Sequence, residues 1–125
     1  MSRTTWLIAA ASLAVIAGIP QARAGDAALG VKVFNICKAC HEIATPKKKV
    51  GPSLQGLMGR TAGTLADFPY SDAMKNSGIV WNVDTLKAYL ADPKGNIPGN
   101  KMPFAGVKKP DDLDNLLAYL AEAAK

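Results

Sequence analysis

The sequence predicts an all-α fold, and three features of the chain support this prediction. Two segments, one near each end of residues 25–125, carry apolar residues at the spacing of an amphipathic helix. No segment alternates apolar and polar residues over the length of a β-strand. The segments between the helical patterns are rich in glycine and proline, which predicts long ordered loops. Such loops in a small domain need something to pack on.

Residues 1–24 have the organisation of a secretory signal peptide. Arg3 precedes an apolar run over residues 6–19, and an Ala-x-Ala site ends at Ala24. We therefore expect cleavage after Ala24, export, and one domain over residues 25–125. The alternative is an uncleaved membrane anchor, but the apolar run is short for a transmembrane span.

The charge of the chain is mildly basic. Fifteen basic and ten acidic residues give a formal net charge of +5. Removal of the signal segment takes away Arg3 and Arg23 and no acidic residue, which leaves +3. This excess suits an acidic protein partner, and basic residues do not interleave with aromatic ones as in nucleic-acid-binding proteins. We expect no nucleic-acid partner and no stable membrane insertion after cleavage.

The first helix is predicted from Asp26, a good N-cap, to about His41. Its apolar face includes Val33 and Phe34 and carries both cysteines of the chain. Gly30 lies inside this helix, where it costs about 1 kcal/mol relative to alanine. A glycine at such a position suggests that another backbone approaches closely.

The rest of the chain is predicted as loops and shorter helices. Residues 44–70 form a loop, because glycine and proline recur too often for long elements. A short helix is expected over 71–78, with Ser71 as N-cap, and another over 83–92, ended by Pro93.

The last part of the chain is predicted as a loop followed by a terminal helix. Residues 93–110 contain four prolines and three glycines and are again a predicted loop. The terminal helix runs from about Asp111 to Ala124, with Asp111 and Asp112 at its positive end and a stripe of leucines along one face.

Cys37, Cys40 and His41 are the only cysteines and the only histidine of the chain. They form C-x-x-C-H, the attachment signature of c-type haem. Two thiols three residues apart on a helix project on one side and can bond to the two vinyl groups of one porphyrin. His41, the next residue, can then ligate the iron.

Three other interpretations of the motif are weaker. A thioredoxin-like redox pair needs a βαβ context, which the pattern lacks. A zinc site needs a fourth ligand and usually a second Cys/His pair. A disulfide across two intervening residues in a helix is strained, and it leaves His41 without a role.

A methionine is the candidate ligand for the other side of the iron, because the chain has no second histidine. Met1 lies in the signal segment, and Met58 and Met74 lie where ordinary packing is expected. Met102 lies in "IPGNKMPFAG", where prolines and glycines stiffen a loop that can hold a weak thioether ligand. We therefore predict Met102.

Taken together, the motifs resemble those of the small class I cytochromes c of bacteria and mitochondria. The resemblance spans residues 25–125 and rests on C-x-x-C-H followed by "GPSLQGLMGR", "YSDAMKNSGIVW", "LKAYLADP", "IPGNKMPFAG" and "LLAYL", in that order. It implies a fold in which the N- and C-terminal helices cross, and in which short helices and long loops wrap around one covalently bound haem c.

The resemblance also implies the residues of the site. Cys37 and Cys40 would carry the thioethers, and His41 and Met102 would be the axial ligands. The Pro52 carbonyl would accept a hydrogen bond from His41, and Tyr89 would lie near the Met102 sulfur. The residues expected near the haem propionates are Arg60, Tyr70, Trp81 and Asn100.

The propionate roles agree with elementary chemistry, because buried negative groups need donors such as a guanidinium, a phenol or an indole N–H. For Tyr70, Trp81 and Tyr89 the alternative is plain core packing.

Three further expectations follow from the resemblance. Gly30 and Phe34 would cross the terminal helix near Leu116 and Tyr119. Met74, where the family often has a polar residue, and Pro103, directly after the predicted ligand, depart from the usual pattern. Both departures bear on the redox potential and not on ligation.

The function implied is one-electron transfer, without enzymatic activity, by a periplasmic monomer. Implied partners are redox proteins with acidic docking patches: a cytochrome bc complex as donor, and a terminal oxidase or photosynthetic reaction centre as acceptor. Seven lysines are expected to ring the haem edge: Lys32, Lys38, Lys49, Lys94, Lys101, Lys108 and Lys109. Lys47 and Lys48 are expected only to keep their loop soluble. The alternatives are a gas-binding or peroxidase-like haem protein with a labile methionine, and a dedicated electron acceptor of a periplasmic dehydrogenase.

Overall fold

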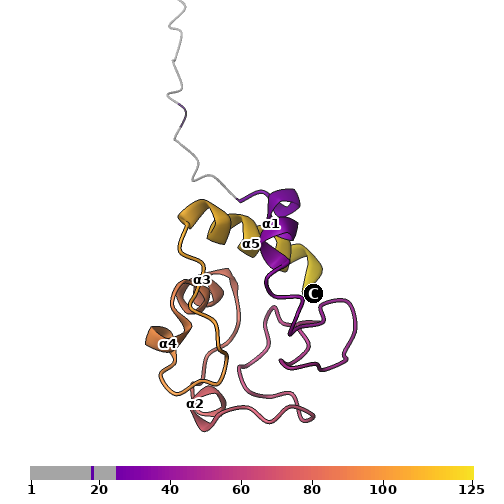
Figure 1. Cartoon of the computed structure of the whole chain (residues 1–125), viewed down its shortest axis with the longest axis vertical. Helices are drawn as coiled ribbons and strands as arrows, with labels where there is room; N and C mark the ends of the chain where they lie inside the picture. The colour runs from indigo at the N-terminus through magenta and orange to yellow at the C-terminus, as the bar shows by residue number, and fades with distance from the viewer. Residues whose placement is uncertain (1–17, 19–24) are drawn as a thin grey trace, which may run out of the picture.

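The structure is a computed structural model that describes residue 18 and residues 25–125. This part of the chain contains five helices, which are α1 (Ala27–Phe34), α2 (Asp72–Lys75), α3 (Val83–Ala91), α4 (Pro93–Asn96) and α5 (Pro110–Ala123) (Figure 1). Its only β-pairing is an isolated bridge between Thr61 and Val80. The predicted all-α class is confirmed. The predicted signal peptide lies, apart from Gly18, outside the described residues.

Helix α1 is shorter than the sequence predicts. The Asp26 carboxylate caps it by accepting two backbone N–H groups of the first turn. Regular helix ends at Phe34, whereas the prediction ran to His41. The chain continues in tight turns, in which Cys37 N–H donates to the Phe34 carbonyl at 2.8 Å and Cys40 N–H to the Cys37 carbonyl at 3.1 Å. No glycine or proline marks this change of hydrogen-bond pattern, so the sequence gives no signal for it.

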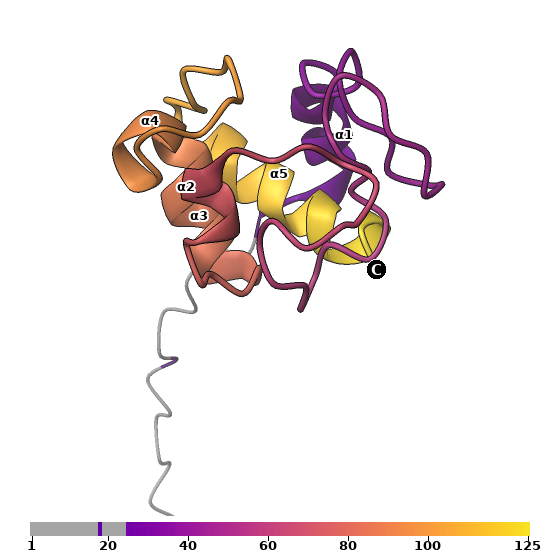
Figure 2. The ribbon, with the colours of Figure 1, turned by 90° about the horizontal axis from the view of Figure 1, so that it is seen from below.

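Helices α1 and α5 cross, and both views show them in contact (Figures 1 and 2). The crossing point is Gly30, which is buried. A Cβ added to Gly30 would overlap the carbonyl group of Asn115 and lie 2.7 Å from the Tyr119 Cβ. The ring of Phe34 packs on that of Tyr119, with centroids 5.2 Å apart. The predicted crossing at Gly30 and Phe34 is confirmed, and it explains the glycine inside a helix.

Helices α2 and α3 begin at predicted residues. The Ser71 hydroxyl accepts from Met74 N–H at 3.0 Å, although α2 is a single turn and does not fill residues 71–78. Asn82 and Thr85 form a capping box, in which each side chain accepts the other's backbone N–H at 2.9 Å. These caps fix where the chain enters both helices.

Helix α4 is a single turn inside the segment that the sequence predicts as a loop. Pro93 begins it at a position where a missing N–H has no cost. The Asp92 carboxylate caps it by accepting from Gly95 N–H at 3.1 Å. The prediction used Pro93 only as a stop signal, whereas this residue both follows α3 and starts α4.

The apolar core joins α1, α3 and α5. Its buried members include Phe34 of α1, Leu86 and Tyr89 of α3, and four leucines of α5, which are Leu113, Leu116, Leu117 and Leu120. Each fully buried side chain of this size contributes about 1.5–3 kcal/mol. Over residue 18 and residues 25–125, no helix is both long and apolar enough to cross a membrane.

Candidate functional site

A cavity of about 620 Å³ opens beside the core. Its walls come from the turns after α1, the loop that follows them, helices α3 and α5, and the segment around residue 102. Nine of the ten predicted site residues line it: Cys37, Cys40, His41, Pro52, Arg60, Tyr70, Trp81, Tyr89 and Met102. Its size is that of a site for a cofactor, about 300–1,000 Å³.

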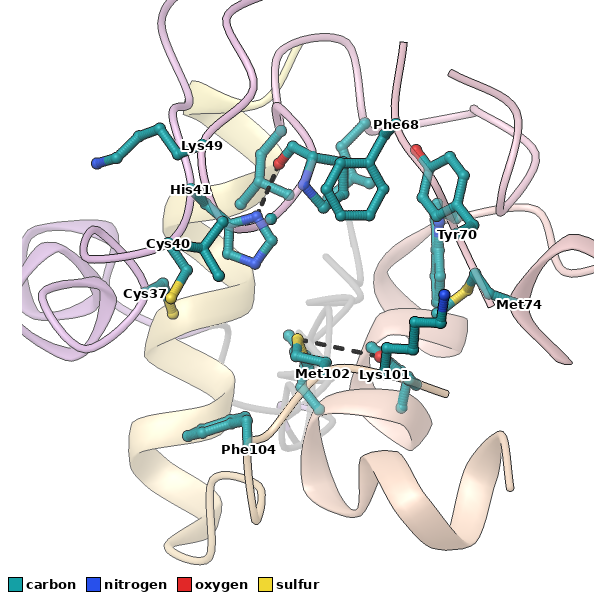
Figure 3. A pocket seen from close by; sticks show the side chains of 18 of the residues that line it. Cys37, Cys40, His41, Lys49, Phe68, Tyr70, Met74, Lys101, Met102 and Phe104 are labelled. Atoms are coloured by element: carbon teal, nitrogen blue, oxygen red, sulfur yellow. Dashed lines mark hydrogen bonds between the residues drawn. The ribbon is translucent and has the colours of Figure 1, made fainter. Parts of the chain in front are cut away.

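Cys37 and Cys40 lie on the same side of this cavity (Figure 3). Both are free thiols and both are half-buried. Burial, with a smaller effect of Cys40, raises the pKa of Cys37 to about 11. A reactive redox thiol has a lowered pKa, so burial opposes the redox-pair interpretation of the motif. Within the described residues, no group of three or more His, Cys, Asp or Glu side chains could hold a metal ion, which opposes the zinc interpretation.

His41 points into the cavity from the wall opposite Met102 (Figure 3). Its Nδ1 lies 2.7 Å from the Pro52 carbonyl oxygen, which can only accept, so Nδ1 carries the proton and donates. Burial lowers the pKa of His41; the hydrogen bond to Pro52 opposes this effect, and the charge of Lys49 adds to it. The ring is therefore neutral and keeps the lone pair of Nε2 for a metal ion.

Gly51 supports the ring of His41 from behind, a role that the sequence pattern did not reveal. A Cβ on Gly51 would lie 2.8 Å from Nδ1 and 2.9 Å from Nε2 of that ring. Only a residue without a side chain leaves room for the imidazole in this orientation.

Met102 directs its sulfur into the cavity from the wall opposite His41 (Figure 3). The Tyr89 hydroxyl lies 4.0 Å from that sulfur and can donate to it. Burial raises the pKa of Tyr89 to about 12, so the phenol keeps its proton. An imidazole nitrogen and a thioether thus face each other across one space, and both would be able to hold a metal ion there.

Arg60, Tyr70 and Trp81 bring polar groups to the lining. The Arg60 guanidinium donates to the carbonyls of Ser53 at 2.9 Å and Gln55 at 3.1 Å, which leaves other N–H donors of its five. Burial lowers the pKa of Arg60 and raises that of Tyr70, and each charge partly offsets the effect on the other.

Asn100, the tenth predicted site residue, is not among the residues that line the cavity. Its amide is engaged with the backbone behind Met102. Nδ2 of this amide already donates to two backbone carbonyls. The place of Asn100 near a propionate stays a prediction.

Several lining residues were not predicted, among them the aromatic side chains of Phe68 and Phe104. Met74, predicted as a departure from the family pattern, lines the cavity too. Lys48 also lines it and donates to the Asp67 carbonyl at 2.6 Å, whereas the sequence suggested only loop solubility. Met74 and Phe104 lie within segments that resemble the family, but nothing in those segments indicated that their side chains face the cavity. Phe68 and Lys48 lie outside these segments.

The residues of the cavity fit a covalently attached haem. The two thiols, the imidazole and the thioether match the donor set of c-type haem ligation. The apolar lining fits the porphyrin faces, and Arg60 fits an acidic substituent. A helical domain that builds such a site is a class I c-type cytochrome.

The comparisons with known proteins agree. Residues 27–124 match the family model for cytochrome c. Cytochrome c2 iso-2 of Magnetospirillum fulvum is 58% identical over 87 residues, which cover 70% of this chain and 91% of that protein. Cytochrome c-550 of Nitrobacter winogradskyi is 51% identical over 102 residues, which cover 81% and 94%.

A solved structure is similar as well. Cytochrome cH from Methylobacterium extorquens aligns with a TM-score of 0.73 and 49% identity, over 78% of this chain and 98% of that one. The chain belongs to the cytochrome c family. Its cofactor is covalently bound haem c, and its class is that of electron carriers.

Proposed function

We propose that the chain is a periplasmic carrier of single electrons, with Cys37 and Cys40 as thioether attachments and His41 and Met102 as axial ligands. The observation that carries the proposal is the placement of His41 and Met102 on opposite walls of the one cavity that both cysteines line. When bound there, haem c supplies one-electron exchange between iron(III) and iron(II).

The ligand residues determine what the site can do. His41 is held in one tautomer by the Pro52 carbonyl, and Met102 is backed by Tyr89. His41 and Met102 together would leave no iron position open for a substrate, so we propose that the protein is not an enzyme. Methionine–histidine ligation favours the reduced state and raises the potential. Ligands that stay in place in both states keep reorganisation small.

The polar lining stabilises the acidic edge of the cofactor in this proposal. Arg60, Tyr70 and Trp81 line the cavity and would donate to the propionates. Arg60 is pre-oriented for this by its two bonds to backbone carbonyls. A buried carboxylate without such donors would be costly.

Lysines near the cavity mouth would steer the protein to acidic partners. Lys49 and Lys101 line the cavity, and Lys32, Lys108 and Lys109 line a second, shallower depression of about 470 Å³. Lys38 and Lys94 are exposed but line neither space. Steering of this kind raises association rates and weakens with salt.

We propose a monomer that is exported by cleavage after Ala24 and works between membrane complexes. A cytochrome bc complex would be the donor, and a terminal oxidase or photosynthetic reaction centre the acceptor. Stopped-flow absorbance can measure electron transfer between this protein and such partners across salt concentrations. This measurement distinguishes a general carrier from the dedicated electron acceptor of a single periplasmic dehydrogenase. A general carrier reacts with a bc complex at rates that fall with salt, whereas a dedicated acceptor reacts only with its dehydrogenase.

The test of the ligand set compares the wild type with Met102→Ala. The oxidised wild type should show the weak far-red absorption band of methionine–iron(III) ligation, and its reduced form should bind carbon monoxide slowly. Met102→Ala should lose the band and bind carbon monoxide readily. A wild type without the band and with fast carbon monoxide binding would favour the gas-binding or peroxidase-like alternative.

A further inference from the structure

The Asn100 side chain joins the backbone of Met102 to helix α4. Its Nδ2 donates to the carbonyls of Pro93 at 2.8 Å and Ile97 at 2.9 Å. Its Oδ1 accepts the backbone N–H of Met102 at 2.9 Å. One amide therefore connects the first residue and the C-cap of α4 to the residue that carries the thioether.

The two carbonyls that Asn100 holds belong to buried residues. Pro93 is among the most completely buried side chains of the described chain, and Ile97 is 4% exposed. Ile97 N–H donates to the Pro93 carbonyl at 3.0 Å, and Asn100 N–H to the Ile97 carbonyl at 3.1 Å. The amide of Asn100 is thus attached to a rigid, well-packed turn.

The segment around Met102 has few other attachments. Within the described residues, Met102 N–H has no backbone acceptor, and Pro103 has no N–H to donate. Phe104 N–H bonds only to the Met102 carbonyl, at 2.9 Å. The next backbone tie to another element is Val107 N–H to the Leu90 carbonyl, at 2.8 Å. Asn100 is therefore the link that fixes the backbone at Met102.

We propose that Asn100 is the positioning residue for Met102, which it holds so that the sulfur points across the cavity at His41. It acts with Tyr89, whose hydroxyl lies 3.4 Å from the Asn100 Oδ1 and 4.0 Å from the Met102 sulfur. This inference rests on the proposed role of Met102. A thioether is a weak ligand, so its persistence depends on how rarely the segment around it opens.

The first measurement uses the wild-type holoprotein. NMR-detected amide exchange should show Met102 protected about tenfold or more relative to Lys101, an exposed residue whose N–H has no partner among the described hydrogen bonds. One hydrogen bond of typical net strength changes an opening equilibrium by up to about tenfold. Equal, fast exchange of the two amides would overturn the proposal.

The second measurement uses Asn100→Leu, which has a similar volume and no hydrogen-bonding groups. The matched control is Asn96→Leu, because Asn96 is exposed at the end of α4 and its side chain makes no hydrogen bond within the described structure. Asn100→Leu should bind carbon monoxide about tenfold faster or more in the reduced state, with a weaker far-red band. Asn96→Leu should match the wild type.

Two further variants make each result decisive. If Asn100→Leu does not accumulate, Asn100→Asp replaces it in the experiment. Asn100→Asp keeps the acceptor for Met102 N–H and loses both donors. Its rate of carbon monoxide binding should lie between those of the wild type and Asn100→Leu. Wild-type rates in whichever Asn100 variant is measured would refute the role of Asn100. Met102→Ala separates the two proposals: if it binds carbon monoxide no faster than the wild type, the ligand assignment of Met102 fails instead.

Discussion

The substitution Gly30→Ala tests the crossing of the terminal helices. In an exposed helix this change stabilises the helix by about 1 kcal/mol. At Gly30 the added Cβ would overlap the Asn115 carbonyl and lie 2.7 Å from the Tyr119 Cβ. The Asn115 carbonyl belongs to the backbone of α5 and cannot rotate away, so α1 and α5 must separate.

The expected magnitude is the difference between two effects. Overpacking in a tight core costs about 1–3 kcal/mol, and a backbone contact belongs at the upper end of that range. Subtraction of the propensity gain of about 1 kcal/mol leaves a net loss of about 2 kcal/mol. For a domain of this size that loss lowers Tm by about 8–16 °C.

Thermal unfolding of the holoprotein, followed by far-UV circular dichroism, measures this loss. The control is Ala28→Gly, at an exposed position of α1, which should cost about 1 kcal/mol or less through propensity alone. A Tm for Gly30→Ala equal to or above that of the wild type would refute the steric reasoning, because helix propensity would then dominate at the crossing.

Three other predictions concern the site, a helix cap and the response to alkaline pH. Gly51→Ala should displace the His41 ring, so the visible spectrum should show weakened axial ligation; an unchanged spectrum would mean that the ring adapts. Asn82→Ala should cost about 1 kcal/mol in urea unfolding through loss of the capping box, and an unchanged midpoint would contradict this. Burial raises the pKa of Tyr70 above its ordinary 10.0, so the folded state holds a proton that the unfolded chain releases. This contribution to stability is complete below pH 10 and is lost as pH rises through the folded pKa. The urea midpoint of Tyr70→Phe should therefore fall less than that of the wild type between about pH 9 and pH 11. An equal fall of the two midpoints would contradict this prediction.

The sequence determined those parts of the fold that have local signals. Ser71 marks the start of α2 through a hydrogen bond within one turn, and it was predicted as the N-cap. Asn82 caps α3 in the same way, but the prediction began that helix at Val83 without naming its cap. Gly30 indicated a close backbone contact, and the leucine stripe of α5 indicated its buried face. The early end of α1 has no comparable signal. The start of α4 has one, because Asp92 caps this helix and Pro93 occupies its first position, but the prediction used Pro93 only as a stop.

The candidate site divides in the same way. C-x-x-C-H indicates haem attachment from five consecutive residues. Met102 could be distinguished from core methionines because it lies in a proline-rich loop. The bonds of Asn100 were not predicted, because its partners at Pro93 and Ile97 depend on α4, and the segment of α4 was predicted as a loop. The role of Gly51 was not predicted, because it depends on the His41 ring, which only the folded chain brings against this glycine.

Mass spectrometry of the purified protein tests the central claim most directly, namely that Cys37 and Cys40 hold one haem. The intact mass should equal that of residues 25–125 plus a single haem, and the haem should remain on a proteolytic peptide containing Cys37 and Cys40 after acid extraction. A mass without haem, with both thiols free to alkylation, would contradict the account.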